Sequence, residues 1–215
     1  MTDRVVPIPG VAAAVLAGGL SRRMGRDKAT LPIGEGGVAL GRLVLAVAAA
    51  VADPVMLVAP AGHAAATLAG AAAGAGEAGV ALVADPGEGP LAALAAALAA
   101  VETPHLLLLA ADHPGLRVEL LRGLLAERGS AQAVACRRGE RLEPLVAVYE
   151  RAPALAAART RLGLGAGADQ SLRGLLASLR PRVLEEAEWR RLDPDGRSFT
   201  DLDDPADLAA WQAGR

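Results

Sequence analysis

Short apolar runs alternate with longer alanine- and leucine-rich segments through most of the chain, and this alternation restricts the possible folds more than any other feature. The apolar runs lie directly before Gly18 and at Val55–Ala59, Val80–Ala84 and His105–Ala110. Runs of this length, bounded by Gly, Pro or Asp, are typical of strands buried on both faces of a sheet. The segments of helical character are Val38–Val51, Ala64–Ala72, Leu91–Val101 and Val118–Glu127. Strand and helix in this order predict parallel strands joined by right-handed crossovers.

A different pattern follows Ser130, where two strand-like runs flank a polar turn. The runs are Gln132–Arg137 and Leu145–Glu150, and the turn is Arg138–Glu143. This arrangement predicts an antiparallel insertion. A glycine-rich loop, Gly163–Asp169, is then expected to precede a helix over Gln170–Leu179.

The length of the chain and the lack of a linker predict one domain. A chain of 215 residues fits a single core, because cores grow to about 250 residues before chains usually split. We therefore expect a single α/β domain with three layers, Rossmann-like, built on a mostly parallel sheet. Ligands should bind beyond the carboxyl ends of its strands.

Composition restricts the environment and the partners. The hydrophobic fraction is 53% but the aromatic fraction only 2%, so the core must consist mainly of Ala, Val and Leu. The mean hydropathy is +0.33, yet the apolar runs fall short of the roughly 20 residues of a membrane-spanning helix. No signal-peptide pattern begins the chain, so we expect a cytoplasmic protein with no membrane partner. The net charge of −2 argues against a nucleic-acid partner.

The loop after the first apolar run contains residue types suited to phosphate binding. The adjacent Gly18 and Gly19 remove side chains where backbone N–H groups can approach an anion. Arg23 adds a planar guanidinium group, which can bind phosphate through two hydrogen bonds, and Lys28 adds a compact positive charge. Taken alone, these residues also fit an ordinary solvated turn. Their spacing matches neither the Walker loop nor the Gly-x-Gly-x-x-Gly motif, which disfavours P-loop NTPases and Rossmann dehydrogenases.

The whole stretch LAGGLSRRMGRDKATLP resembles the signature loop of the molybdenum cofactor guanylyltransferases, the MobA family. The resemblance implies a fold of the nucleotide-diphospho-sugar transferase type and an enzyme that joins GMP from GTP to the terminal phosphate of molybdopterin, releasing pyrophosphate. It implies Mg²⁺ as the cofactor, catalytic roles for Lys28 and Arg23, and molybdoenzymes or other cofactor-biosynthesis proteins as further partners. The implied GTP-binding residues are Leu16, Ala17, Gly18, Gly19, Arg23, Lys28, Asp85 and Asp112.

Three acidic positions extend this resemblance. Asp112 stands where the family carries an Asp-x-Pro magnesium ligand, and Asp85 opens a turn, DPGEGPL, similar to one at the family's nucleotide. Both also suit ordinary turns or caps. Asp203 lies in a tail that resembles the family's Asn-x-Asn ending with aspartates in place of the asparagines, and we expect it to join Asp112 at the metal. Alternatively, the neighbouring Asp204 only caps a helix that starts at Pro205.

The remaining polar residues are less informative. The three histidines, at 63, 105 and 113, are expected at the surface or in caps, and the lone Cys136 in the core. Arginines 137, 138 and 141 suit either a pterin phosphate or a solvated charge cluster. We divide the domain into a nucleotide-binding half, 1–130, and a pterin-binding or acceptor-binding half, 131–215. The family's Asn after the second strand is absent, so any contact to guanine there must come from backbone or water.

Three other functions remain open at this point. A cytidylyltransferase acting on the same cofactor would share fold and metal, although its loop usually has Ala-Gly in place of Gly18-Gly19. A sugar-phosphate nucleotidyltransferase usually spaces its Arg and Lys further apart. A non-catalytic carrier that delivers the cofactor would not need Lys28 and Asp112, which are both intact here.

Overall fold

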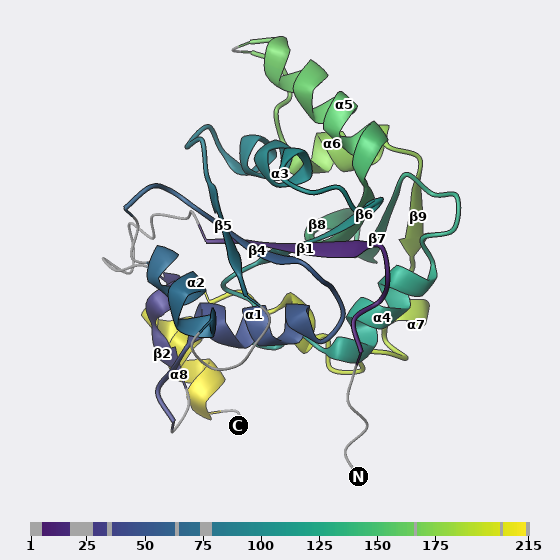
Figure 1. Cartoon of the computed structure of the whole chain (residues 1–215). Helices are drawn as coiled ribbons and strands as arrows, with labels where there is room; N and C mark the ends of the chain where they lie inside the picture. Colours follow the sequence, from purple (N-terminus) through teal and green to yellow (C-terminus); the bar gives the residue numbers. More distant parts are fainter. Residues whose placement is uncertain are drawn as a thin grey trace.

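A seven-stranded mixed sheet runs through the middle of the molecule in the order β5-β4-β1-β6-β8-β7-β9 (Figure 1). The computed structural model describes residues 6–17, 28–33, 36–62, 65–73, 79–165, 167–202 and 204–213. Four neighbouring strands are parallel: β1 (Val11–Leu16), β4 (Val55–Ala59), β5 (Ala81–Ala84) and β6 (His105–Ala110). The prediction of an α/β fold with a mostly parallel sheet is confirmed.

Helices cover both faces of the sheet and complete the three layers. One face carries α3 (Pro90–Ala99), α5 (Arg151–Gly163) and α6 (Leu172–Ser178). The other carries α1 (Leu40–Ala49), α2 (Ala66–Ala73), α4 (Val118–Ala126) and α7 (Glu186–Trp189). Side chains of β1 alternate between two hydrophobic clusters, with Val11, Ala13 and Val15 in one and Ala12 and Ala14 in the other. This two-sided burial explains why the strand has no polar residue.

The segment after α4 forms the predicted antiparallel insertion. β7 (Ala133–Arg138) and β8 (Arg141–Glu150) pair antiparallel, and β8 also pairs antiparallel with β6. The turn is shorter than predicted, because Arg138 still pairs with Arg141. β9 (Pro181–Leu184), which the sequence did not reveal, adds a parallel edge strand beside β7.

The chain between Lys28 and α1 differs from the prediction. Instead of one helix over Val38–Val51, two short antiparallel strands, β2 (Pro32–Ile33) and β3 (Val38–Ala39), precede α1. The helix begins at Leu40, whose backbone N–H donates to Leu31 O at 2.9 Å.

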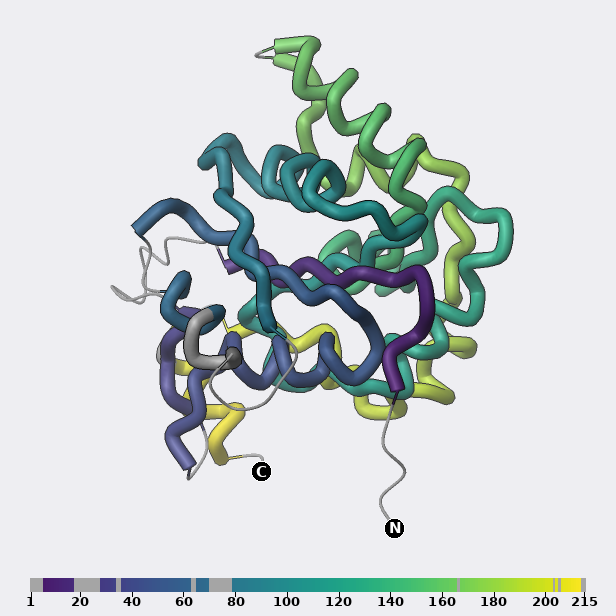
Figure 2. The backbone as a smooth tube through the Cα atoms, in the orientation of Figure 1, coloured from purple at the N-terminus to yellow at the C-terminus, as the bar shows by residue number. Residues whose placement is uncertain are grey.

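The C-terminal helix α8 (Pro205–Ala213) lies beside α1 and the β2–β3 pair (Figures 1 and 2). It follows a short 3₁₀ helix, η2 (Arg197–Phe199). A third, small hydrophobic cluster holds these segments together and consists of Ile33, Leu40, Leu202 and Trp211.

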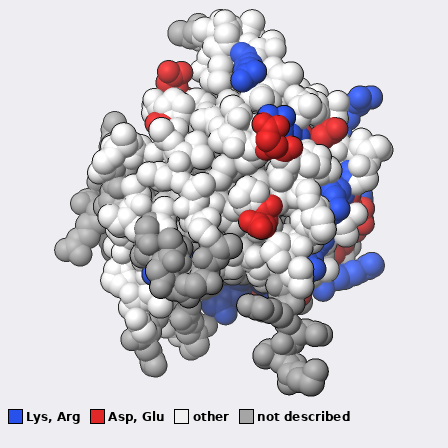
Figure 3. All heavy atoms as spheres, viewed as in Figure 1, with Lys and Arg blue, Asp and Glu red and all other residues white. Residues whose placement is uncertain are grey.

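Charged side chains are unevenly distributed over the face shown in Figure 3. Lys and Arg gather there toward the side formed by β7, β9, α4 and α7, while much of the remainder is uncharged. Within the described ranges, no helix is long and apolar enough to cross a membrane.

Candidate active site

The four parallel strands end at one edge of the sheet. Leu16 of β1 lies opposite Val58 of β4 and Ala110 of β6, and Ala59 lies opposite Ala84 of β5. Strands that end in register deliver the loops after them to one crevice, where open α/β sheets bind their ligands. The loops that follow carry the residues expected from the sequence to form the site.

Lys28 and Asp112 meet at this edge. Lys28 opens the 3₁₀ helix η1 (Lys28–Thr30), and Asp112 follows β6 by two residues. The Lys28 Nζ lies 3.6 Å from Asp112 Oδ2, and the side chains are 15% and 27% exposed. The pair is therefore sheltered on most sides but still open to a ligand. Lys28 is also the single lysine of the chain, which otherwise uses arginine for all its basic side chains.

Close packing fixes the position of Lys28. Ala29, the next residue, is buried against Gly41 of α1, where an added Cβ would lie 3.1 Å from Ala29 O and 2.8 Å from Leu68 Cδ1. Gly41 is thus required by this close approach. The Leu31 N–H donates to Lys28 O at 3.0 Å, which closes the turn.

Backbone hydrogen bonds fix Asp112 from two directions. Ala111 N–H donates to Leu16 O at 2.9 Å, and Leu202 N–H donates to Asp112 O at 3.2 Å. The neighbouring His113 is only 6% exposed, so the prediction that it lies at the surface or in a cap is wrong. Its Nε2 lies 3.9 Å from Asp112 Oδ1, which places the carboxylate between an imidazole and an ammonium.

Asp85 lies at the same edge and shapes a turn. Its backbone N–H donates to Ala59 O at 3.0 Å, and its Oδ1 accepts from Gly87 N–H at 2.9 Å. Gly89, with φ of 96°, then precedes Pro90 at the start of α3. The side chain has a structural task in this turn, and Asp85 is half-buried at the carboxyl edge of the sheet.

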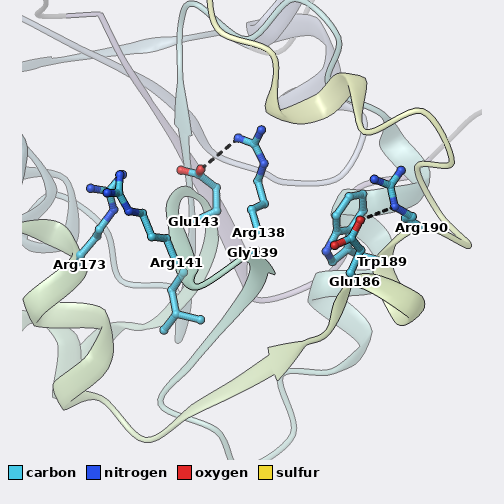
Figure 4. A pocket seen from close by; sticks show the side chains of 9 residues that line it. Arg138, Gly139, Arg141, Glu143, Arg173, Glu186, Trp189 and Arg190 are labelled. Carbon is cyan, nitrogen blue, oxygen red and sulfur yellow. Dashed lines mark hydrogen bonds and ion pairs between the residues drawn. The ribbon is translucent and has the colours of Figure 1, made fainter.

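A cavity of about 410 Å³ lies beside the β7–β8 turn (Figure 4). Its lining residues are Arg138, Gly139, Arg141, Leu142, Glu143, Arg173, Glu186, Trp189 and Arg190. Because β8 runs antiparallel to β6, this turn lies toward the edge that carries Asp112. The cavity thus lies toward the carboxyl end of β6 and is lined by residues from the C-terminal part of the chain.

Of the four arginines that line this cavity, two form ion pairs with glutamates and two do not. Arg138 pairs with Glu143 at 3.8 Å, and Arg190 pairs with Glu186 at 2.7 Å. Arg141 and Arg173 extend toward the same part of the cavity in Figure 4, and neither makes an ion pair or hydrogen bond within the described part of the chain. The two carboxylates that line the cavity, Glu143 and Glu186, pair with Arg138 and Arg190, so the Arg141 and Arg173 guanidinium groups are suited to an anion between them.

Comparison with known proteins identifies the family. A family model described as a MobA-like NTP transferase domain matches residues 13–183. The chain belongs to this family. A relative named "Probable molybdenum cofactor guanylyltransferase" from Chloroflexus aggregans is 32% identical over 209 residues, which cover 94% of each protein. Another of the same name from Mycobacterium avium is 32% identical, covering 95% of this chain and 96% of the relative.

Solved structures support the fold of this MobA-like transferase. Molybdopterin-guanine dinucleotide biosynthesis protein A from Archaeoglobus fulgidus superposes with a TM-score of 0.74 at 23% identity, covering 94% of this chain and 97% of that one. The 4-diphosphocytidyl-2C-methyl-D-erythritol synthase from Anaerococcus prevotii gives 0.71 at only 10% identity, with 95% of each chain covered. The fold is thus shared with proteins of very different sequence.

Four expected site residues, Gly18, Gly19, Arg23 and Asp203, lie outside the described residues. Of the neighbouring predicted binders, Ala17 donates its N–H to Val58 O at 2.8 Å, and the Leu16 carbonyl accepts from Ala111. The Ala17 N–H is therefore engaged with β4, and the Leu16 carbonyl with the residue that follows β6. The predicted capping role of Asp204 is confirmed, because its Oδ1 accepts from the N–H groups of Ala206 at 2.8 Å and Asp207 at 3.0 Å.

The side chains present suit a lightly ligated Mg²⁺ better than a closed metal centre. Nowhere in the described ranges do three His, Cys, Asp or Glu side chains cluster as metal ligands. Mg²⁺ keeps several waters and needs only one or two carboxylates when phosphate oxygens complete its shell. The Asp112 carboxylate at the crevice satisfies that requirement. Cys136 is buried, and burial raises its pKa to about 12, which excludes a thiolate nucleophile near neutral pH.

Sequence reasoning missed two residues of the site region. Arg173 lies on α6 and reaches the cavity from a different element than Arg141. His113 contacts Asp112 only because the loop after β6 turns it inward. The placement of Arg173 beside Arg141 joins two elements whose relative position no local pattern reveals, and no local pattern shows that His113 is buried.

Proposed function

We propose that this MobA-like transferase is a molybdenum cofactor guanylyltransferase, which transfers GMP from GTP to the terminal phosphate of molybdopterin. The observation that carries the proposal is the Lys28–Asp112 pair at the carboxyl edge of the sheet. It occurs in a chain whose relatives, matched over nearly their whole length, are named for this activity.

The reaction requires positioning and charge neutralisation. An oxygen of the acceptor phosphate attacks the α-phosphorus of GTP, a P–O bond forms, and the bond from that phosphorus to the β-phosphate oxygen breaks. The electron pair leaves with pyrophosphate. A phosphate monoester is anionic near neutral pH, so the nucleophile needs no general base. Catalysis then depends on aligning two polyanions and stabilising the charge that develops.

The described residues suit these tasks. Lys28 places a compact positive charge where the triphosphate would lie, and its turn and Gly41 contact hold it there. Asp112 would hold Mg²⁺, which supplies neutralisation of the triphosphate when bound. Asp203 is proposed as a second carboxylate for the ion. Support for it comes from Leu202, the preceding residue, which donates its N–H to Asp112 O.

The acceptor is proposed to bind on the C-terminal side. Arg141 and Arg173, which have no ion pair with any described residue, suit the terminal phosphate of molybdopterin, since guanidinium groups bind phosphate in a bidentate manner. This assignment fits the division into a nucleotide half, 1–130, and an acceptor half, 131–215. Molybdoenzymes, other cofactor-biosynthesis proteins and a cytoplasmic location remain part of the proposal.

The function is tested by supplying Mg²⁺, molybdopterin and one of GTP, CTP, ATP or UTP, and measuring pyrophosphate and the dinucleotide product. We expect the highest kcat/KM with GTP. A preference for CTP would indicate a cytidylyltransferase. If a parallel assay with a sugar phosphate in place of molybdopterin alone gives turnover, the protein is a sugar-phosphate nucleotidyltransferase. No pyrophosphate under any condition would favour the carrier.

The acceptor site has its own test within the same assay. Arg141→Ala and Arg173→Ala should each raise KM for molybdopterin by about tenfold, a loss of roughly 1.4 kcal/mol, without changing KM for GTP. Arg159→Ala, on exposed α5 surface, removes the same charge and should leave both constants unchanged. Equal effects of all three substitutions would remove the two arginines from the acceptor site.

A further inference from the structure

The C-terminal segment contacts both halves of the Lys28–Asp112 pair. We define the strap as residues 197–202 together with α8, the described part of which ends at Ala213. Its two ends are joined, because the Arg197 guanidinium lies 4.4 Å from the centre of the Trp211 ring. The two parts of the strap therefore contact each other.

On one side the strap contacts the segment that carries Lys28. Leu202 and Trp211, which are 1% and 9% exposed, form a cluster with Ile33 and Leu40. Leu40 is the first residue of α1, and its N–H donates to Leu31 O. The segment from Lys28 to α1 is thus packed against the strap on one side and against Gly41 on the other.

On the other side the strap contacts the loop that carries Asp112. Leu202 N–H donates to Asp112 O, and the Ser198 hydroxyl accepts from Arg117 N–H at 3.0 Å. Gly115 in this loop packs so closely on the Arg197 carbonyl that a Cβ would overlap it. Leu202 therefore contacts both the segment that carries Lys28 and the loop that carries Asp112.

We propose that Leu202 and Trp211 are positioning residues, which set the distance between Lys28 and Asp112 for nucleotide binding and transfer. The two charged residues lie on loops from different strands, and the strap contacts the segment of Lys28 through the third hydrophobic cluster and the loop of Asp112 through the Leu202 hydrogen bond. Misplacement of a reacting group by about 1 Å can cost up to 10²-fold in rate. The effect on turnover rests on the proposed function, whereas the effect on the ion pair does not.

The single lysine provides a direct probe of the pair. Reductive methylation with ¹³C-formaldehyde labels only Lys28 and the N-terminal amine, and it keeps the positive charge. Asp112→Asn should shift the dimethyl-Lys28 NMR signal and so mark the position of a broken pair. Trp211→Ala should move the signal to that same position. Trp211→Phe should leave it unmoved.

Leu98→Ala is the matched control for general loss of packing. Leu98 is fully buried near the end of α3, away from the carboxyl edge, so its truncation lowers stability without touching the strap. Its signal should stay at the wild-type position. If Trp211→Ala does not fold, Trp211→Leu keeps more apolar volume and should give a smaller shift in the same direction. A wild-type signal in every folded Trp211 variant, or no shift in Asp112→Asn, overturns the proposal.

Turnover separates positioning from stability in a second way. Trp211→Ala should lower kcat by about 10-fold to 100-fold, and in a Lys28→Ala background it should cause no further loss, because it acts through Lys28. Additive losses in the double variant would contradict the positioning role. Absence of turnover in the wild-type protein would count against the proposed function, while the NMR comparison would still decide the role of the strap.

Discussion

The Lys28 ammonium lies 3.6 Å from the Asp112 carboxylate, so the loop after β1 and the loop after β6 are joined by an ion pair at the centre of the site. Each charge is neutralised by the other in this state. A triphosphate competes for the ammonium and a divalent cation competes for the carboxylate. In the proposed function, binding of the two ligands together would exchange one ion pair for two interactions with opposite partners, which would favour uptake of the nucleotide as its Mg²⁺ complex.

Lys28→Ala should lower kcat about 10²–10³-fold, the range found for removal of an electrostatic group at a transition state. The free energy of unfolding should change by about 1 kcal/mol or less, because the ion pair is still reached by solvent. Steady-state kinetics and thermal denaturation of the same sample check both parts. An unchanged kcat in the folded variant would exclude Lys28 from the mechanism, and Arg159→Ala controls for the loss of one positive charge.

Asp112→Ala should abolish Mg²⁺-dependent turnover, because the described carboxylate at the crevice is removed. Binding of Mn²⁺ in the presence of GTP, followed by EPR, should weaken in parallel and gives a measurement independent of turnover. Asp203→Asn, which restores the residue type usual in the family, should keep much of the activity. Asp195→Ala, which removes an exposed carboxylate after α7, should behave as wild type. Wild-type Mn²⁺ affinity in Asp112→Ala would refute the assignment.

Gly41→Ala should lower kcat although alanine is the better helix former. The new Cβ would press on Ala29 and Leu68 and displace the turn that holds Lys28. Gly123→Ala, in α4, is the control, because the three atoms nearest to its Cβ would all belong to the flexible side chain of Leu192. It should lower the melting temperature without changing kcat. Equal kcat values for the two variants would show that the Gly41 contact does not position Lys28.

Acid should weaken the contact between α7 and β9 through Glu188. The hydrogen bond from Arg182 to the Glu188 carboxylate, followed by the N–H of Glu185, lowers the pKa of Glu188 below 4.5 in the folded state. A depressed pKa contributes stability above the unfolded value, and this contribution is lost as pH falls through the folded value. Glu188→Gln should therefore reduce the stability at pH 7 and flatten the decline of stability as the pH falls below about 4.3, the ordinary pKa of a glutamate. Parallel stability curves for the variant and wild type would contradict this.

Much of the scaffold was predictable, because strands that are buried on both faces consist of continuous runs of apolar residues. The observed β4 and β6 match the predicted Val55–Ala59 and His105–Ala110. Asp112 was likewise identifiable, since it follows such a run directly. Local sequence could not reveal β2 and β3, which have two residues each and depend on pairing with one another.

The parts of the site that escaped prediction depend on contacts between distant segments. Arg173 and Arg141 line one cavity only because α6 packs near the β7–β8 turn. Similarly, Leu202 appears in the sequence as one leucine in an acidic tail, and its importance follows from the hydrogen bond to Asp112 and the cluster with Leu40. No periodicity or spacing in the sequence predicts either of these contacts.

The most direct test of the central claim follows the phosphorus atoms of GTP. The purified protein is incubated with Mg²⁺, molybdopterin and GTP labelled at either the α- or the γ-phosphate, and the products are separated. We predict that the α label enters the pterin product, that the γ label leaves as pyrophosphate, and that Lys28→Ala and Asp112→Ala suppress both together. Release of the γ label as orthophosphate, or a pterin product that lacks the α label, would contradict nucleotidyl transfer at the Lys28–Asp112 site.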